Sequence, residues 1–148
     1  MRMTEGLRTI SRQKALYAQG RTVAGPDVGP SRPLGRVVTN APPGFSLHHY
    51  GVACDSCQAG KNPWDLPWDK FADLAKGHGL YSGFYWPKNK KDQPHLELAY
   101  GGMSVEQMLN LYQNHGLASV WAEFDKIRGV PVESEWKSAN LLKMGETT

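Results

Sequence analysis

Two histidines and an aspartate stand out in this chain because their residue types and spacing fit metal chemistry. His48 and Asp55 are seven residues apart, and His95 follows 40 residues after Asp55. Two imidazoles and one carboxylate form a three-ligand set for zinc, and a hydrolytic zinc site keeps its fourth position open for water. Asp92 lies three residues before His95 and is placed to take a proton from that water. The sequence therefore predicts that His48, Asp55 and His95 bind Zn²⁺, with Asp92 as the general base.

The segment between the first two ligands must bend for both to reach one metal ion. Fully extended, it would span roughly 23 Å, whereas zinc ligands lie about 2.0–2.2 Å from the ion. We expect the bend at Gly51, because glycine adopts backbone angles that are closed to other residues. Residues 52–55 are then predicted to form a short strand in which Asp55 shares a face with the small Ala53.

The residues that follow Pro94 alternate between two faces, as in a strand. One face carries His95, Glu97 and Ala99, and the other carries Leu96, Leu98 and Tyr100. The apolar face is expected to pack on the core, so that His95 points into a cleft. Glu97 lies on the same face as His95 and is the rival general base, although the spacing favours Asp92.

Taken together, these residues resemble a known enzyme family. The pattern is Ser46-x-His48-x-x-Gly51-x-Ala53-x-Asp55 followed by Asp92-x-x-His95. It is similar to that of the zinc D-Ala-D-Ala carboxypeptidases and L-alanyl-D-glutamate endopeptidases, which include VanX- and VanY-type enzymes and many phage endolysins. Residues 7–22 also resemble the segment that precedes the zinc motif in this family. The resemblance covers about residues 5 to 100.

The resemblance implies roles for further residues. Arg8 matches an arginine thought to hold the substrate carbonyl or the developing oxyanion, and one such fixed donor is worth roughly 2.7–4 kcal/mol. Gln13 and Ser46 match polar positions that line the substrate cleft. Trp86 stands where the family often has a tryptophan before its last histidine. The implied fold is α+β, with a small antiparallel sheet flanked by helices, like that of the Hedgehog and D-Ala-D-Ala peptidase group.

The resemblance also implies an activity, the hydrolysis of an amide bond in the peptide stem of peptidoglycan. The L-Ala–D-Glu bond is the first choice, because residues 16–21 are similar to a stretch found in such endolysins. A D-Ala-D-Ala carboxypeptidase is the alternative among enzymes. A noncatalytic zinc-bearing domain that binds the cell wall is an alternative of another class, against which Asp92 and Arg8 both argue.

Size and composition fit one compact enzyme domain. At 148 residues the chain is within the range of a single core. We predict a catalytic domain over residues 1–129 and a tail over 130–148 that packs on this domain or trails from it, and we expect a monomer. Residues 1–5 do not begin a signal peptide, and no apolar run is as long as a membrane span. For a wall-cleaving enzyme this predicts synthesis in the cytoplasm and release to the wall, as for a phage endolysin.

The positive charge is unevenly distributed. The net charge is +3, and residues 1–50 carry seven Lys or Arg against only two acidic residues. Such a basic region could attract an anionic wall polymer or could simply serve solubility, and the sequence favours neither. Binding of nucleic acid is a poorer explanation, because no recognisable module accompanies the charge.

Two cysteines flank the aspartate ligand, where apolar residues are more usual in the family. Cys54 and Cys57 could form half of a structural zinc site or a redox pair, but no second CxxC is present. They point to opposite faces if the strand continues, and they could pair in an oxidising compartment if it ends at Ser56. We favour Cys54 as a small buried apolar residue.

The other histidines have structural interpretations. His49 faces away from His48 on an extended backbone, which indicates packing or exposure to solvent rather than metal binding. His78 lies between two glycines and is predicted to end a helix. His115 precedes Gly116 at a predicted helix C-terminus, where a cation suits the helix dipole.

The remaining elements are predicted from local patterns. Ser11 is expected to cap a short helix that runs through Tyr17. Residues 22–45 are rich in glycine and proline and are predicted to form a long loop that frames the site. A strand is expected over residues 80–86. Further helices are predicted to begin near Asp65 and Pro67, at Ser104 with its capping-box partner Gln107, and near Leu117.

Overall fold

The computed structural model describes residues 1–60, 62–98 and 102–129, and these belong to two compact units, Met1–Tyr100 and Gly101–Thr148. The predicted tail over residues 130–148 lies outside the described residues. The helices that follow residue 101 belong to the second unit, whereas we predicted one catalytic domain over residues 1–129, so the extent of that domain stays a prediction. No helix in the described ranges is long and apolar enough to cross a membrane.

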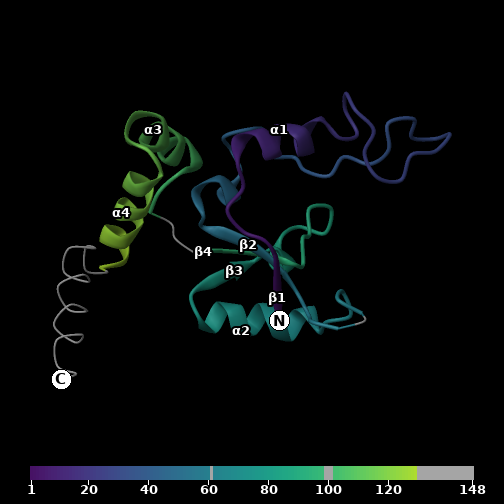
Figure 1. The fold of residues 1–148 in the computed structure, drawn as a ribbon. Helices are drawn as coiled ribbons and strands as arrows, with labels where there is room; N and C mark the ends of the chain where they lie inside the picture. Colours follow the sequence, from purple (N-terminus) through teal and green to yellow (C-terminus); the bar gives the residue numbers. More distant parts are fainter. Residues whose placement is uncertain (61, 99–101, 130–148) are drawn as a thin grey trace, which may run out of the picture. The chain divides into compact units, whose positions relative to one another are not determined.

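The first unit is built on a four-stranded antiparallel sheet with the strand order β1-β2-β4-β3. Its strands are β1 (Arg2–Glu5), β2 (Ala53–Cys57), β3 (Leu80–Ser82) and β4 (His95–Leu98). Figure 1 shows helix α2 on one side of this sheet and helix α1 on the other. This confirms the predicted α+β class with a small antiparallel sheet, while the more specific Hedgehog- or peptidase-like fold stays a prediction.

The strand register places ionisable residues on one face of the sheet. Glu5 pairs with Asp55, and Asp55 pairs with His95, so the three side chains form a row across β1, β2 and β4. Because successive strand residues point to opposite faces, the neighbouring Leu96 lies on the other face, opposite Ser82 of β3. Leu96 and Ser82 are both buried. The predicted alternation after Pro94 is confirmed up to Leu98.

Strand β3 is shorter than we predicted. It ends at Ser82, because a 3-10 helix (η2, Gly83–Tyr85) begins directly after it. The Ser82 hydroxyl accepts a hydrogen bond from the Phe84 backbone N–H at 3.1 Å and so caps this turn. The prediction of a strand over residues 80–86 was therefore wrong beyond Ser82.

The helices of the first unit begin at capping positions. Helix α1 (Ile10–Ala18) is capped by Thr9, whose hydroxyl accepts a hydrogen bond from the Arg12 N–H at 3.1 Å. The prediction of Ser11 as the cap was wrong, because Ser11 lies within the first turn. Helix α2 (Trp68–Gly77) follows Pro67 and ends at His78, as predicted.

The core of the first unit includes one of the two cysteines. Cys57 is fully buried, whereas Cys54 is only half-buried, so the prediction of Cys54 as the buried residue was wrong. Both thiols are free. Strand β2 continues through Cys57, so the two side chains point to opposite faces.

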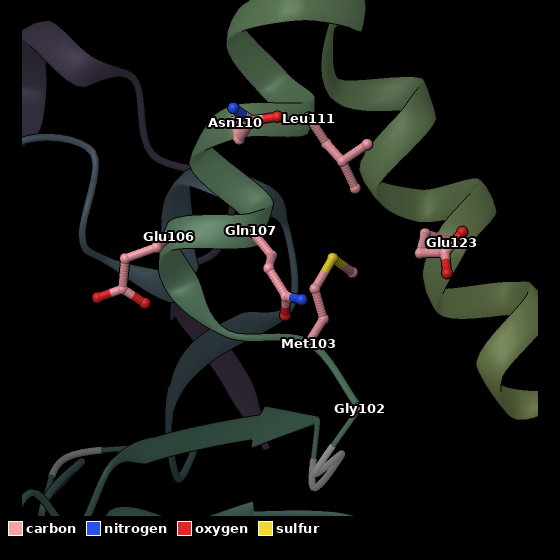
Figure 2. Close-up of a pocket in the computed structure, with 7 residues that line it drawn as sticks. All are labelled: Gly102, Met103, Glu106, Gln107, Asn110, Leu111 and Glu123. Atoms are coloured by element: carbon pink, nitrogen blue, oxygen red, sulfur yellow. The ribbon is translucent and has the colours of Figure 1, made fainter.

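In the second unit, the described residues 102–129 form two helices that are joined at Gly116. Helix α3 (Val105–His115) begins with the predicted capping box: the Ser104 hydroxyl accepts from the Gln107 N–H at 3.2 Å, and the Gln107 side chain accepts from the Ser104 N–H at 2.7 Å. Helix α4 (Leu117–Arg128) follows, and His115 ends α3 as predicted. Figure 2 shows an open pocket in this unit, lined by Gly102, Met103, Glu106, Gln107, Asn110, Leu111 and Glu123.

Candidate metal centre

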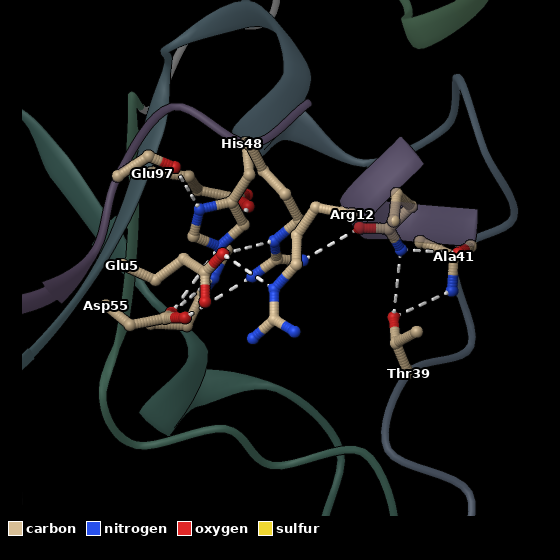
Figure 3. Close-up of polar contacts among 11 residues, drawn as sticks. Glu5, Arg12, Thr39, Ala41, His48, Asp55 and Glu97 are labelled. Carbon is tan, nitrogen blue, oxygen red and sulfur yellow. Dashed lines mark hydrogen bonds and ion pairs between the residues drawn. The ribbon is translucent and has the colours of Figure 1, made fainter. Parts of the chain in front are cut away.

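The three predicted metal ligands converge on one face of the sheet. His48 Nε2 lies 3.5 Å from Asp55 Oδ1, and His95 Nδ1 lies 3.3 Å from the same oxygen. One potential ligand atom from each residue lies within 4.8 Å of the other two. Both histidines are buried and Asp55 is half-buried. Figure 3 shows the polar contacts that surround this cluster.

The local backbone explains how residues distant in sequence meet. His48 lies in a 3-10 helix (η1, Leu47–Tyr50) that ends at Gly51, whose φ of 66° places it in the left-handed region. A side chain at this position would be strained, so the predicted bend at glycine is confirmed. The chain then enters β2, and antiparallel pairing brings Asp55 opposite His95.

Each histidine has a second partner that fixes the role of its ring nitrogens. His48 Nδ1 donates to the backbone oxygen of Gly6 at 2.9 Å, because a carbonyl can only accept, and this leaves Nε2 free to bind a metal. His95 Nε2 lies 3.0 Å from Glu97 Oε2, which leaves Nδ1 on the side of Asp55. Protein metal sites commonly orient their histidines through such outer partners. The donor set and its surroundings therefore fit zinc.

The pKa values of Asp55 and His95 both differ strongly from the ordinary values of these side chains. Burial alone would raise the pKa of Asp55, but hydrogen bonds from His48 and His95 outweigh it and lower that pKa well below its usual range. Burial alone would lower the pKa of His95, but its contacts with Asp55 and Glu97 raise it to about 9. Without a metal, a proton on His95 thus balances the carboxylates, and a metal ion must displace that proton.

Arg8 is fixed at the edge of the cluster. Its Nε donates to Glu5 Oε1 at 3.0 Å, and its Nη1 donates to Gln13 Oε1 at 2.8 Å. Its Nη2 lies 3.7 Å from Asp55 Oδ2, and only 9% of the side chain is exposed. The structure therefore places the predicted arginine beside the predicted metal ligands.

Gln13 is a buried residue that holds the guanidinium of Arg8. Its side chain is fully buried and donates to the Ala41 backbone oxygen at 2.7 Å and to the Thr39 hydroxyl at 3.4 Å. Residues 39 and 41 belong to the predicted loop over residues 22–45. These contacts tie Arg8 to the loop, and direct contact of Gln13 with substrate stays a prediction.

Ser46 and Trp86, the other two predicted substrate contacts, both lie near the candidate ligands. Ser46 is close to His48 in sequence, and Trp86 contacts His95. Ser46 directly precedes η1 and is buried. The Trp86 ring packs on the His95 ring with 4.8 Å between their centroids and 44° between their planes. Trp86 therefore covers one side of a candidate metal ligand. A substrate contact of either residue stays a prediction.

Asp92 lies within electrostatic range of the cluster. Its pKa is raised, first by desolvation of the carboxylate and then by the negative charge of Asp55. Its backbone N–H donates to the Gly83 oxygen at 3.0 Å, and its own oxygen accepts from the His95 N–H at 3.2 Å. A Cβ atom at Gly83 would overlap the backbone oxygen of Asp92. Glycine is therefore needed at position 83, because any side chain there would displace the backbone of Asp92.

Three supporting residues were not assigned these roles from the sequence. Glu5 binds Arg8 from a strand that the sequence pattern did not indicate. Gly83 accommodates Asp92, and no local pattern signals such a contact. His49 is buried, with Nδ1 2.8 Å from the Arg8 backbone oxygen, so packing is confirmed for this histidine and exposure to solvent is excluded.

A curated bacterial enzyme is similar to part of this chain. No protein-family model matches the chain. The chain is 35% identical over 109 residues to the peptidoglycan L-alanyl-D-glutamate endopeptidase CwlK of Bacillus subtilis (strain 168). The aligned region covers 65% of this chain and 59% of the relative, so the chain spans less than two thirds of the length of that relative.

Proposed function

We propose that this protein is a zinc-dependent peptidase that hydrolyses the L-Ala–D-Glu bond in the stem peptide of peptidoglycan, in the same family as its B. subtilis relative. The observation that carries the proposal is the convergence of His48, Asp55 and His95, whose ligand atoms all lie within 4.8 Å of one another. The relative's activity supports the choice of substrate. The site of action would be the bacterial cell wall, where this substrate lies.

The ligand set fits a catalytic rather than a structural zinc site. Structural sites usually close the coordination sphere with four protein ligands, whereas catalytic sites use three and keep one position for water or substrate. The described residues offer three ligands in this cluster. When bound, zinc would polarise the scissile carbonyl and lower the pKa of the attacking water.

The chain's own residues would handle protons and charge. Asp92 would accept a proton from the water whose oxygen attacks the carbonyl carbon, and would deliver a proton to the leaving amine as the C–N bond breaks. Its raised pKa suits this exchange, because an efficient general base has a pKa closer to the working pH. Arg8 keeps further guanidinium donors beyond those bonded to Glu5 and Gln13, and these would stabilise the negative oxygen of the tetrahedral state.

Digestion of purified peptidoglycan tests this proposal. The protein is stripped of metal with a chelator, reloaded with zinc, and incubated with peptidoglycan, and the products are identified by mass spectrometry. We expect fragments with a new N-terminal D-Glu from the zinc-loaded protein and none from the stripped protein. Loss of a terminal D-Ala would instead identify a carboxypeptidase. An unchanged digest that still binds the protein would identify a noncatalytic wall-binding domain, and full cleavage by metal-free protein would exclude zinc catalysis.

A further inference from the structure

Three hydrogen bonds fasten the segment Gly6–Arg8 to the adjacent histidines His48 and His49. The Gly6 backbone oxygen accepts from His48 Nδ1 at 2.9 Å. The Arg8 backbone N–H donates to the His48 oxygen at 2.9 Å. The Arg8 backbone oxygen lies 2.8 Å from His49 Nδ1. The backbone N–H of Arg8 is therefore held by His48, and its backbone oxygen is held by His49.

His49 is not a residue that packing alone would favour at this position. Only 6% of it is exposed, and its Nε2 is a buried nitrogen without a hydrogen-bond partner among the described residues. Leaving a polar atom unbonded in the interior costs about 1–3 kcal/mol. The ring of His49 makes a polar contact through its other nitrogen: Nδ1 donates a hydrogen bond to the Arg8 backbone oxygen, while Nε2 stays unbonded within the described ranges. Nδ1 must be the donor, since the carbonyl oxygen can only accept.

We propose that His49 is a positioning residue whose Nδ1–H fixes the backbone of Arg8, and thereby holds the Arg8 guanidinium beside Asp55. The two histidines then have separate tasks. His48 presents Nε2 to the metal site, while His49 sets where Arg8 stands relative to that site. The catalytic consequence rests on the proposed function, because it requires Arg8 to act on the substrate.

Two amide substitutions separate this role from simple packing. In His49→Asn the amide nitrogen lies near the place of Nδ1 and can still donate to Arg8, whereas in His49→Gln it lies nearer the place of Nε2. We expect His49→Asn to keep turnover within about threefold, and His49→Gln to lower kcat roughly 10- to 100-fold, because small misplacements of a catalytic group cost up to about 100-fold. Zinc content should stay at one ion per chain in both variants.

A second background tests whether His49 acts through Arg8. If it does, His49→Gln should have little further effect on kcat in an Arg8→Ala protein, because linked residues are not additive. Equal kcat for wild type and His49→Gln would overturn the proposal, as would a full additional loss in the Arg8→Ala background.

Two measurements do not depend on turnover. Long-range ¹H–¹⁵N spectra of the wild type should show His49 as the Nδ1–H tautomer, and this requires no variant to fold. Hydrogen exchange of the Arg8 amide should be faster in His49→Gln than in wild type or His49→Asn. An Nε2–H tautomer, or unchanged exchange, would exclude the positioning role. If the wild type cleaves no peptidoglycan but these signatures are present, the proposed function fails while the contact with Arg8 stands.

Discussion

The two faces of the four-stranded sheet are stabilised in different ways. On one face, Leu96 lies between Cys54 and Ser82 in neighbouring strands, and Leu96 and Ser82 are buried. On the other face, Asp55 and His95 are paired across the strands and surrounded by hydrogen bonds. The first face is filled by small or apolar side chains, and its polar member Ser82 bonds to the nearby backbone of Phe84. The second requires particular partners in particular protonation states.

This difference determines what a substitution should do on each face. Loss of apolar volume leaves a cavity and lowers stability. Loss of one partner in a buried charge network leaves the others uncompensated, so its effect should extend to the candidate metal site. Substitutions on the ionisable face should therefore show whether its residues act as one unit.

The largest effect is expected from His95→Ala. Removing one of three ligands should abolish stable zinc binding, which elemental analysis of the purified variant measures directly. His78→Ala removes an exposed histidine at the end of α2 and serves as the matched control. Equal zinc content in both variants would show that the converged side chains do not form the metal site.

The next largest effect is expected from Asp92→Ala. The variant should keep zinc but lose roughly 10²- to 10⁴-fold in kcat, as expected for a lost general base. Glu97→Gln is the informative comparison, because Glu97 is bonded to His95 Nε2 and should act on the ligand instead. It should weaken zinc binding by about 10- to 100-fold. If Asp92→Ala keeps normal turnover while Glu97→Gln at saturating zinc does not, Glu97 is the base.

A smaller effect is expected from Gly83→Ala. The added Cβ would overlap the backbone oxygen of Asp92 and push the general base out of place. We expect kcat to fall by up to about 100-fold with zinc retained. Gly77→Ala is the control, because a Cβ there meets nothing within 4 Å. Equal kinetics for the two variants would show that Asp92 tolerates displacement.

The smallest effect is a pH dependence of stability in metal-free protein. His95 has a pKa of about 9 in the fold, against 6.5 for an unperturbed imidazole. The protonated His95 should make its full contribution to the free energy of unfolding below pH 6.5, and this contribution should be lost as the pH rises to about 9. Denaturant unfolding with a chelator present should therefore show stability falling across this range. Zinc-loaded protein should not show this loss, because zinc binding requires the unprotonated nitrogen, and His95→Ala should lack the slope.

The convergence of the three candidate ligands and the α+β class were predictable because residue types, spacing and strand alternation are visible in the sequence. Residue types and spacing single out His48 and Asp55, Gly51 marks the bend between them, and alternation after Pro94 gives the face on which His95 lies. Strand β1 was missed because Arg2–Glu5 is short and three of its four residues are exposed, so no apolar alternation marks it.

The supporting contacts were not predictable for a different reason. Several of these contacts use backbone oxygens that tertiary folding brings in. His48 donates to the oxygen of Gly6, and Gln13, which holds Arg8, donates to the oxygen of Ala41. Every residue offers a backbone oxygen, so the sequence does not mark which one will be used. The role of Gly83 has the same origin, since it depends on the approach of a loop nine residues later in the chain.

The contact between Trp86 and His95 gives the protein an internal optical reporter. The raised pKa of His95 favours the protonated imidazole beside this indole, and a metal ion bound at His95 must displace that proton. Metal loading should therefore change the charge next to the indole and with it the emission of this tryptophan, and a Trp86→Phe variant would identify its share of the signal. Binding isotherms could then be recorded on the unlabelled protein, in the absence of any cell-wall material.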